Sequence, residues 1–485
     1  MNEVLPRLLS IVKTTALSYP DAPYNPPRQW EEFCSQPPMQ TDAANGVYEA
    51  VRQCLMEMNL DAPHIGTAQW SPFRHFVRPA QHVILKPNFV KGEHPLGRPG
   101  VLSMITHASI LRPLIDYVLL ATCGDVRITI CDAPLQSSVW DDIIEQSGTA
   151  ALLQYYASRG IDIQLVDLRR EVSFLNEEKV ICAREVRERD PLGYVAVDLK
   201  ERSALAPVLN TGPLEITDYP LRSVSEHHNA QKNEYLISRT ILSADFFLCV
   251  PKLKTHKKTG ISVAMKNLIG IIGDKSWIAH HRRGAPGNGG DEFPHARVVP
   301  LMQYRLWSQL KANPALAPAA TMVKRLYQQV ALRGKKLDEV RMDIAPDSQV
   351  FEGSWYGNDT LWRCVLDLNT ILFFADKDGN LHDAPQRNYL ALVDGIIAGE
   401  GEGPMQQTPR PAGMVLASTH PLACDYAAAR LMGYDPMKIR TISGSFEHRA
   451  FPWINFDRDE LERLLANAPD FAPPFRAPAH WRDHL

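Results

Sequence analysis

Apolar runs that end in polar residues alternate with helical periodicities in the first half of the chain. Strands rich in β-branched residues are expected at 82–88, 126–132 and 161–167, with helices at 109–122 and 140–159 between them. A strand–helix–strand–helix–strand order is typical of a parallel sheet with right-handed crossovers. The pattern therefore predicts an α/β protein with a mainly parallel sheet in its first lobe.

Strand and helix signals continue in the second half with longer glycine-rich stretches between them. An apolar strand at 244–250 is followed by strands at 390–397 and 414–418 and a helix at 421–432. We therefore expect a second α/β lobe, with a cleft between the two lobes. The predicted division is a helical and Pro-rich N-terminal extension (1–58), a first α/β lobe (59–259), a second α/β lobe with glycine-rich loops (260–468) and a C-terminal tail (469–485).

Composition narrows the classes of protein to consider. The 485 residues carry a net charge of −3, whereas a general nucleic-acid binder usually has a basic domain or stripe. No apolar stretch approaches the ~18 residues that a membrane span needs, and the first residues do not resemble a signal peptide. The eight cysteines include no C-x-x-C pair, so we expect reduced thiols, no iron–sulfur cluster and a cytoplasmic location.

The strongest candidate site is the basic segment 251–275, which follows an apolar strand directly. In an extended chain alternate side chains share a face, so Lys252, Lys254 and His256 are expected on one side. Lys266 and Asn267 add a second cation and a neutral amide. Lysines and backbone N–H groups suit a phosphate or carboxylate, although the P-loop spacing is absent.

Further candidate residues follow predicted strands. Lys86 and Asn88 end the first strand and Asp132 ends the second, and ligands of parallel sheets bind at these carboxyl ends. His107 precedes a helix, where it has the alternatives of binding, titrating or packing. Asp394, with the glycine-rich segment 399–404, is a candidate for a divalent cation or a general base.

Two polar loops are less specific. The segment 277–292 contains histidines, arginines and glycines, and it is either an exposed surface loop or a loop that closes over an anionic substrate. The segment 355–359 (WYGND) is polar and aromatic, which suits a sugar or a base.

Several segments together resemble the domain of unknown function 362, from about Val83 to Gly433. The segments that carry the resemblance are KPN (86–88), THASILRPL (106–114), the strand with Asp132, EQSG (145–148), SADFFLCVPKLKTH (243–256), MKNLIGIIGD (265–274), LVDGIIAGEGEGP (392–404) and ASTHPLACDYAAARLMG (417–433). The resemblance implies two lobes with a cleft and no established reaction. Many members carry a ferredoxin-like cysteine module that this chain lacks, and the family is distantly similar to the nickel-dependent lactate racemase fold.

The main functional hypothesis is an enzyme that acts on a small phosphorylated or carboxylated metabolite, with or without a divalent metal ion. The residues expected to act in catalysis are His256, Lys86, Asp394 and Glu400. The residues expected to bind substrate are Asn88, Lys252, Lys254, Lys266, Asn267 and His107. The residues expected to hold a metal are Asp394, Glu400 and Asp132. The alternatives are a carrier of a small molecule, cofactor or metal, and an iron–sulfur redox protein; the sequence leaves the oligomeric state open.

Overall fold

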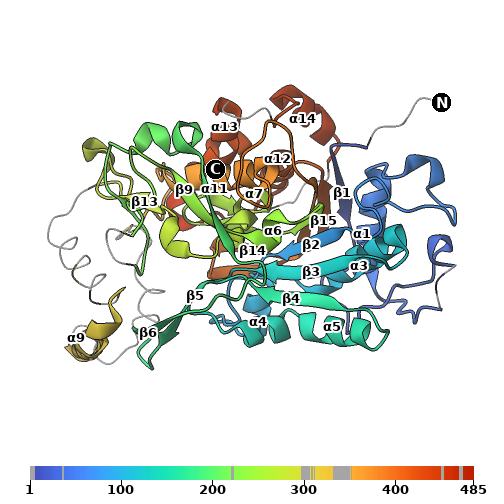
Figure 1. The fold of residues 1–485 in the computed structure, drawn as a ribbon, viewed down its shortest axis with the longest axis horizontal. Coiled ribbons are helices and arrows are strands. Elements are labelled where there is room, and N and C mark those ends of the chain that lie inside the picture. The colour runs from blue at the N-terminus through green and yellow to red at the C-terminus, as the bar shows by residue number, and fades with distance from the viewer. Residues whose placement is uncertain are drawn as a thin grey trace.

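The computed structural model describes residues 6–34, 36, 38–219, 223–295, 306, 310, 312–330, 350, 352–448, 453–468 and 473–485. A nine-stranded sheet runs through the centre of the molecule (Figure 1). Its strand order is β1-β15-β14-β10-β2-β3-β4; β11 also pairs with β14, and β12 pairs with β11. Among the described residues, no helix is long and apolar enough to cross a membrane.

The parallel part of the sheet consists of the strands that the apolar runs predict. They are β2 (His82–Pro87), β3 (Arg127–Asp132), β4 (Ile163–Asp167), β10 (Phe246–Val250) and β14 (Asn388–Glu402). The crossover helices are α2 (Arg98–Leu102), α3 (Ala108–Thr122), α4 (Trp140–Gln146) and α5 (Thr149–Ala157). The single helix expected at 140–159 is divided, because Gly148 adopts a φ of 76° that a right-handed helix cannot contain.

The other edge of the sheet is antiparallel and includes the N-terminal extension. β15 (Gln406–Ser418) pairs with β14, and β1 (Leu9–Lys13) pairs with β15. Within the extension, which was expected to be helical and Pro-rich, residues 9–13 are therefore a sheet strand. α1 (Gly46–Glu57) is the helix of this region. The α/β class with a large, mainly parallel sheet is confirmed, with strands from both sides of residue 260 in one sheet; the domain boundaries stay predictions.

β11 (Lys252–His256) continues beyond β10 and pairs with the second half of β14. Lys252 lies opposite Asp394 and Lys254 opposite Gly399. The glycine-rich segment that was expected to form a loop after residue 397 is thus largely strand. A Cβ at Gly399 would lie 2.7 Å from the Ser103 carbonyl oxygen, so glycine lets the neighbouring chain approach β14 closely.

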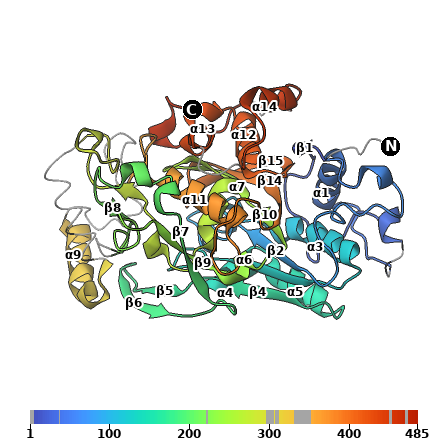
Figure 2. The same ribbon diagram turned by 45° about the horizontal axis from the view of Figure 1, so that its top comes forward.

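Hydrophobic cores lie on both faces of the sheet. Val83 and Leu85 belong to one core and Ile84 to the other, as the alternation of side chains along a strand requires. One face is covered by α1 and α3, and the other by α7 (Ala264–Asn267), α11 (Leu361–Phe374) and α12 (Pro421–Leu431). Figure 2 shows α12 beside α13 (Arg440–Glu447) and α14 (Arg458–Leu465), away from α1 and α3.

Small two-stranded sheets extend the fold beyond the central sheet. They pair β5 (Glu171–Leu175) with β6 (Ile181–Val186), β7 (Tyr194–Asp198) with β9 (Glu234–Ser238), and β8 (Leu214–Glu215) with β13 (His281–Arg282). The remaining elements are β12 (Gly260–Ser262), α6 (Arg239–Leu242) and α9 (Ala317–Val330). The basic and apolar spacing of residues 300–340 is typical of helices; α9 lies in this stretch, whereas 331–349 lies outside the described residues.

Candidate anion site

The carboxyl ends of the parallel strands bring most of the predicted site residues together. Lys86 lies at the end of β2, Asp132 ends β3, and β11 follows β10 at the same edge. Asn267, at the end of α7, bridges two of these groups: its Oδ1 accepts from Lys86 Nζ at 3.0 Å and from Asn88 Nδ2 at 3.2 Å. This edge is where parallel sheets bind ligands.

Lys86 is a buried lysine whose charge is balanced. Its Nζ lies 2.7 Å from Asp132 Oδ1 and also donates to the Pro87 carbonyl oxygen. Burial raises the pKa of Asp132 above its ordinary value, although the charge of Lys86 opposes this. Gly270 is packed against the pair, because a Cβ there would lie 1.9 Å from Asp132 Oδ1. The pair fixes the local structure and leaves Lys86 little freedom to meet a substrate.

Lys252 is also balanced, by Asp394 at 3.1 Å. Tyr19 donates its hydroxyl to Asp394 at 2.8 Å and also contacts Lys252, and the His107 N–H donates to Asp394 at 3.0 Å. The His107 side chain accepts from the Ser109 N–H and caps α3, so it acts here as a helix cap. Tyr19 was not predicted, because an isolated tyrosine in an N-terminal extension gives no sign of this contact.

Lys254, two residues further along β11, has only neutral partners. Its Nζ donates to Asn88 Oδ1 at 2.5 Å and to the Met104 carbonyl oxygen at 2.6 Å. Burial, followed by the charge of Lys266, holds the pKa of Lys254 well below its ordinary value. Asn88 thus lies between Lys254 and Asn267, which connects the two sequence motifs.

Lys254 belongs to a group of basic side chains that influence one another electrostatically, which we call the cationic cluster. Its members are Lys254, His256, Lys258, Lys266, Lys275 and His280. Lys258 and Lys275 donate to the carbonyl oxygens of Glu352 and Ile269. Within the described residues, Lys266 has no hydrogen-bond or ion-pair partner, and none of the four lysines has a carboxylate within ion-pair distance.

Most pKa values of the cluster follow from burial first and from the neighbouring positive charges second. Burial, followed by the charge of Lys258, lowers the pKa of Lys266 to about 7. Burial also lowers the pKa of Lys275 to about 7, although Asp132 opposes the shift. Burial and the neighbouring lysines hold the pKa values of His256 and His280 well below the ordinary range. At neutral pH the histidines are therefore neutral, and Lys266 exchanges a proton readily.

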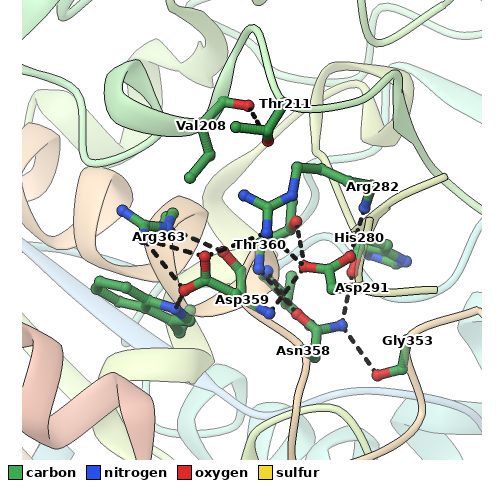
Figure 3. Close-up of polar contacts among 12 residues, drawn as sticks. Val208, Thr211, His280, Arg282, Asp291, Gly353, Asn358, Asp359, Thr360 and Arg363 are labelled. Atoms are coloured by element: carbon green, nitrogen blue, oxygen red, sulfur yellow. Dashed lines mark hydrogen bonds and ion pairs between the residues drawn. The ribbon is translucent and has the colours of Figure 1, made fainter. Parts of the chain in front are cut away.

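The segment around His280 is fixed by hydrogen bonds from two other parts of the chain (Figure 3). Asn358 donates to the His280 carbonyl oxygen at 2.9 Å, and the Arg282 N–H donates to Asp291 at 2.5 Å. Thr360 donates its hydroxyl to the second oxygen of Asp291 at 2.6 Å. The 355–359 loop, expected to suit a sugar or a base, here supports the backbone beside the cationic cluster.

The three carboxylates expected to hold a metal do not meet. Glu400 accepts from Arg410 at 2.9 Å and from the Arg476 N–H at 3.0 Å, while Asp394 and Asp132 each face a lysine. Asp394 and Glu400 would share a face in a regular strand, but the register of β14 shifts between Gly395 and Ile397. The two side chains have separate neighbours, Lys252 for Asp394 and Arg410 for Glu400.

A different group in the described part of the chain has the spacing of metal ligands. Glu215, His281 and Glu292 each place one ligand atom within 4.8 Å of the others. Sequence reasoning missed this group because Glu215 lies far from the other two along the chain and matches no ligand motif. The pairing of β8 with β13 brings Glu215 opposite His281.

Comparisons with known proteins identify a family for the central part of the chain. Residues 199–430 match the model of a domain of unknown function, DUF362. No curated protein matches the sequence. A crystal structure of a protein from Thermotoga maritima is similar to this chain with a TM-score of 0.30 and 10% sequence identity. The alignment covers 82% of this chain and 59% of the Thermotoga maritima chain. The expected resemblance to DUF362 is confirmed over residues 199–430, whereas the similarity to nickel-dependent lactate racemase stays a prediction.

Proposed function

We propose that the chain is an enzyme that acts on a small phosphorylated or carboxylated metabolite bound at the cationic cluster. The observation that carries the proposal is that four lysines converge at the edge of the sheet with no carboxylate partner among the described residues. Lys254 and Lys275 are buried, and Lys258 and Lys266 are partly buried. An unbalanced charge that is removed from water is costly. An anionic ligand would supply the missing negative charge and recover that cost.

The contacts suggest separate roles within the cluster. Lys254 and Lys258 are held by neutral acceptors and are suited to binding the anion. Lys266, with a pKa of about 7, is suited to transferring a proton at neutral pH. Asn88 and Asn267 would orient the ligand and the lysines. Lys86, which the sequence suggested as an acid or base, is instead a positioning residue because Asp132 balances it.

Binding is tested by calorimetric titration of inorganic phosphate and pyrophosphate. We expect one site per chain in the wild type and at least about a tenfold loss of affinity in Lys254→Met and Lys266→Met, since a charge-assisted hydrogen bond contributes about 1.5–3 kcal/mol. Glu400→Gln is the matched control, because Glu400 contacts Arg410 rather than the cluster. Equal affinity in all four proteins, or no binding by the wild type, would refute the site.

Turnover separates an enzyme from a carrier that uses the same cluster. Incubation of excess phosphorylated and carboxylated metabolites with the protein should give product in multiple turnovers. Stoichiometric binding without product would favour the carrier. We place the protein in the cytoplasm as part of this proposal, supported by its eight free cysteines.

A further inference from the structure

We propose that Glu215, His281 and Glu292 form a binding site for one divalent transition-metal ion. The site is distinct from the cationic cluster and from the carboxylates Asp132, Asp394 and Glu400. It does not depend on the proposed enzymatic function. The three side chains come from β8, from β13 and from the segment that follows β13.

The backbone around the three residues is tied together. The His280 N–H donates to the Glu215 carbonyl oxygen at 2.8 Å, and the Glu292 N–H donates to the Gly284 carbonyl oxygen at 2.9 Å. His281 is 3% exposed and Glu292 is 1% exposed. The ligand atoms are therefore fixed before a metal arrives, which lowers the conformational cost of binding it.

The geometry between His281 and Glu215 fits two ligands of one ion. His281 Nε2 lies 3.5 Å from Glu215 Oε2, which is long for a hydrogen bond. Two ligand atoms in a tetrahedral Zn²⁺ site, each about 2.0–2.1 Å from the metal, lie roughly 3.3–3.4 Å apart. His281 Nδ1 is buried and has no hydrogen-bond partner among the described residues, so the ring has a protein partner only at Nε2, the nitrogen that faces Glu215.

The carboxylates are oriented as metal ligands commonly are. Arg283 Nε donates to Glu215 Oε1 at 2.6 Å, which leaves Oε2 toward His281. The Gly284 N–H donates to Glu292 Oε2 at 3.0 Å. Such second contacts fix a ligand's direction. One imidazole with two carboxylates suits a borderline ion such as Zn²⁺, and three protein ligands leave a fourth position open.

The experiment is a Zn²⁺ titration in competition with a chromophoric chelator, on metal-stripped full-length protein. We expect one Zn²⁺ per chain in the wild type and at least about a tenfold weaker affinity in Glu292→Gln and His281→Gln, the lower limit for losing even a second-shell contact. Glu400→Gln should bind like the wild type. The proposal fails if the wild type takes up no stoichiometric Zn²⁺, or if both variants bind as tightly as it does.

Co²⁺ gives a second test that needs no variant. Bound at this site in the wild type, Co²⁺ should show the visible absorption of a low-coordinate ion with nitrogen and oxygen ligands, and Zn²⁺ should abolish the spectrum. A Co²⁺ spectrum that remains that of the hydrated ion would overturn the proposal even if the variants failed to fold.

Discussion

Lys252 and Lys254 lie two residues apart on β11, are both buried, and have opposite electrostatic situations. Lys252 has Asp394 at 3.1 Å, whereas Lys254 donates only to an amide oxygen and a carbonyl oxygen. Burial lowers the pKa of both, but Asp394 opposes the shift at Lys252, and Lys266 adds to it at Lys254. Sequence position alone therefore does not separate a lysine that has a carboxylate partner from one that has none.

The same contrast, between lysines with and without a carboxylate partner, applies to the other lysines at this edge of the sheet. Lys86 and Lys252 each have a carboxylate and are part of the folded framework. Lys266 and Lys275 have none within ion-pair distance among the described residues, and both have pKa values near 7. Perturbed pKa values of this kind cluster at functional sites. The predictions below test this division.

The largest effect is expected from breaking the Lys252–Asp394 pair. Asp394→Asn leaves the Lys252 charge buried without its partner, so the free energy of unfolding should fall by about 3–5 kcal/mol in denaturant titrations. The double variant Lys252→Met/Asp394→Leu should recover much of this loss, since it removes both charges. A single variant as stable as the wild type would show that the pair is not structural.

The affinity for an anion should depend on pH. An anion bound beside Lys266 and Lys275 raises their pKa values from about 7, so binding takes up protons. Affinity should therefore fall as pH rises above 7, by up to about tenfold per unit for each proton taken up. Sulfate is the better probe because its charge is constant over this range. A flat profile from pH 7 to 9 would contradict the pKa values assigned to these lysines.

Removing an unbalanced lysine should stabilise the protein. Lys266→Met is expected to raise the free energy of unfolding at pH 7 by about 1 kcal/mol or more, because it removes a burial cost. In the wild type, the free energy of unfolding should rise with pH between about 7 and 10. In this range Lys266 is protonated in the unfolded chain and largely neutral in the folded one. The variant should lack that part of the pH dependence. Destabilisation by Lys266→Met would mean that an unseen partner balances it.

The smallest effect is expected at Glu400. Its contacts with Arg410 and the Arg476 N–H lie on the partly exposed side of β14. Glu400→Gln should therefore cost about 0.2–1 kcal/mol of unfolding free energy. A loss comparable to that of Asp394→Asn would show that the two acids act together after all.

Much of the fold was predictable because the apolar runs are long and end in polar residues. The strands ending at Lys86-Pro87 and Asp132 and the extended Lys252–His256 segment follow from local pattern alone. The neighbours of each side chain, in contrast, could not be predicted from local pattern. The register shift between β14 and β15 after Gly395, which lies between Asp394 and Glu400, depends on how the two strands pair.

Contacts distant in sequence were also hidden. Tyr19 reaches Asp394 from the N-terminal region, and Glu215 reaches His281 through a two-stranded sheet. Neither the periodicity of the sequence nor the spacing of its motifs predicts contacts of this kind. The sequence could therefore place the basic site at the sheet edge, but not distinguish its balanced lysines from its unbalanced ones.

The most direct test of the unbalanced cluster is the pKa of Lys266 itself, measured by competitive amine acylation and mass spectrometry across pH. The account predicts titration near pH 7 without ligand and a clear upward shift in saturating sulfate. Lys200, on the exposed surface, serves as the internal reference for amine reactivity. Titration of Lys266 near 10.4, the value of an unperturbed lysine, with no response to sulfate would contradict the central claim.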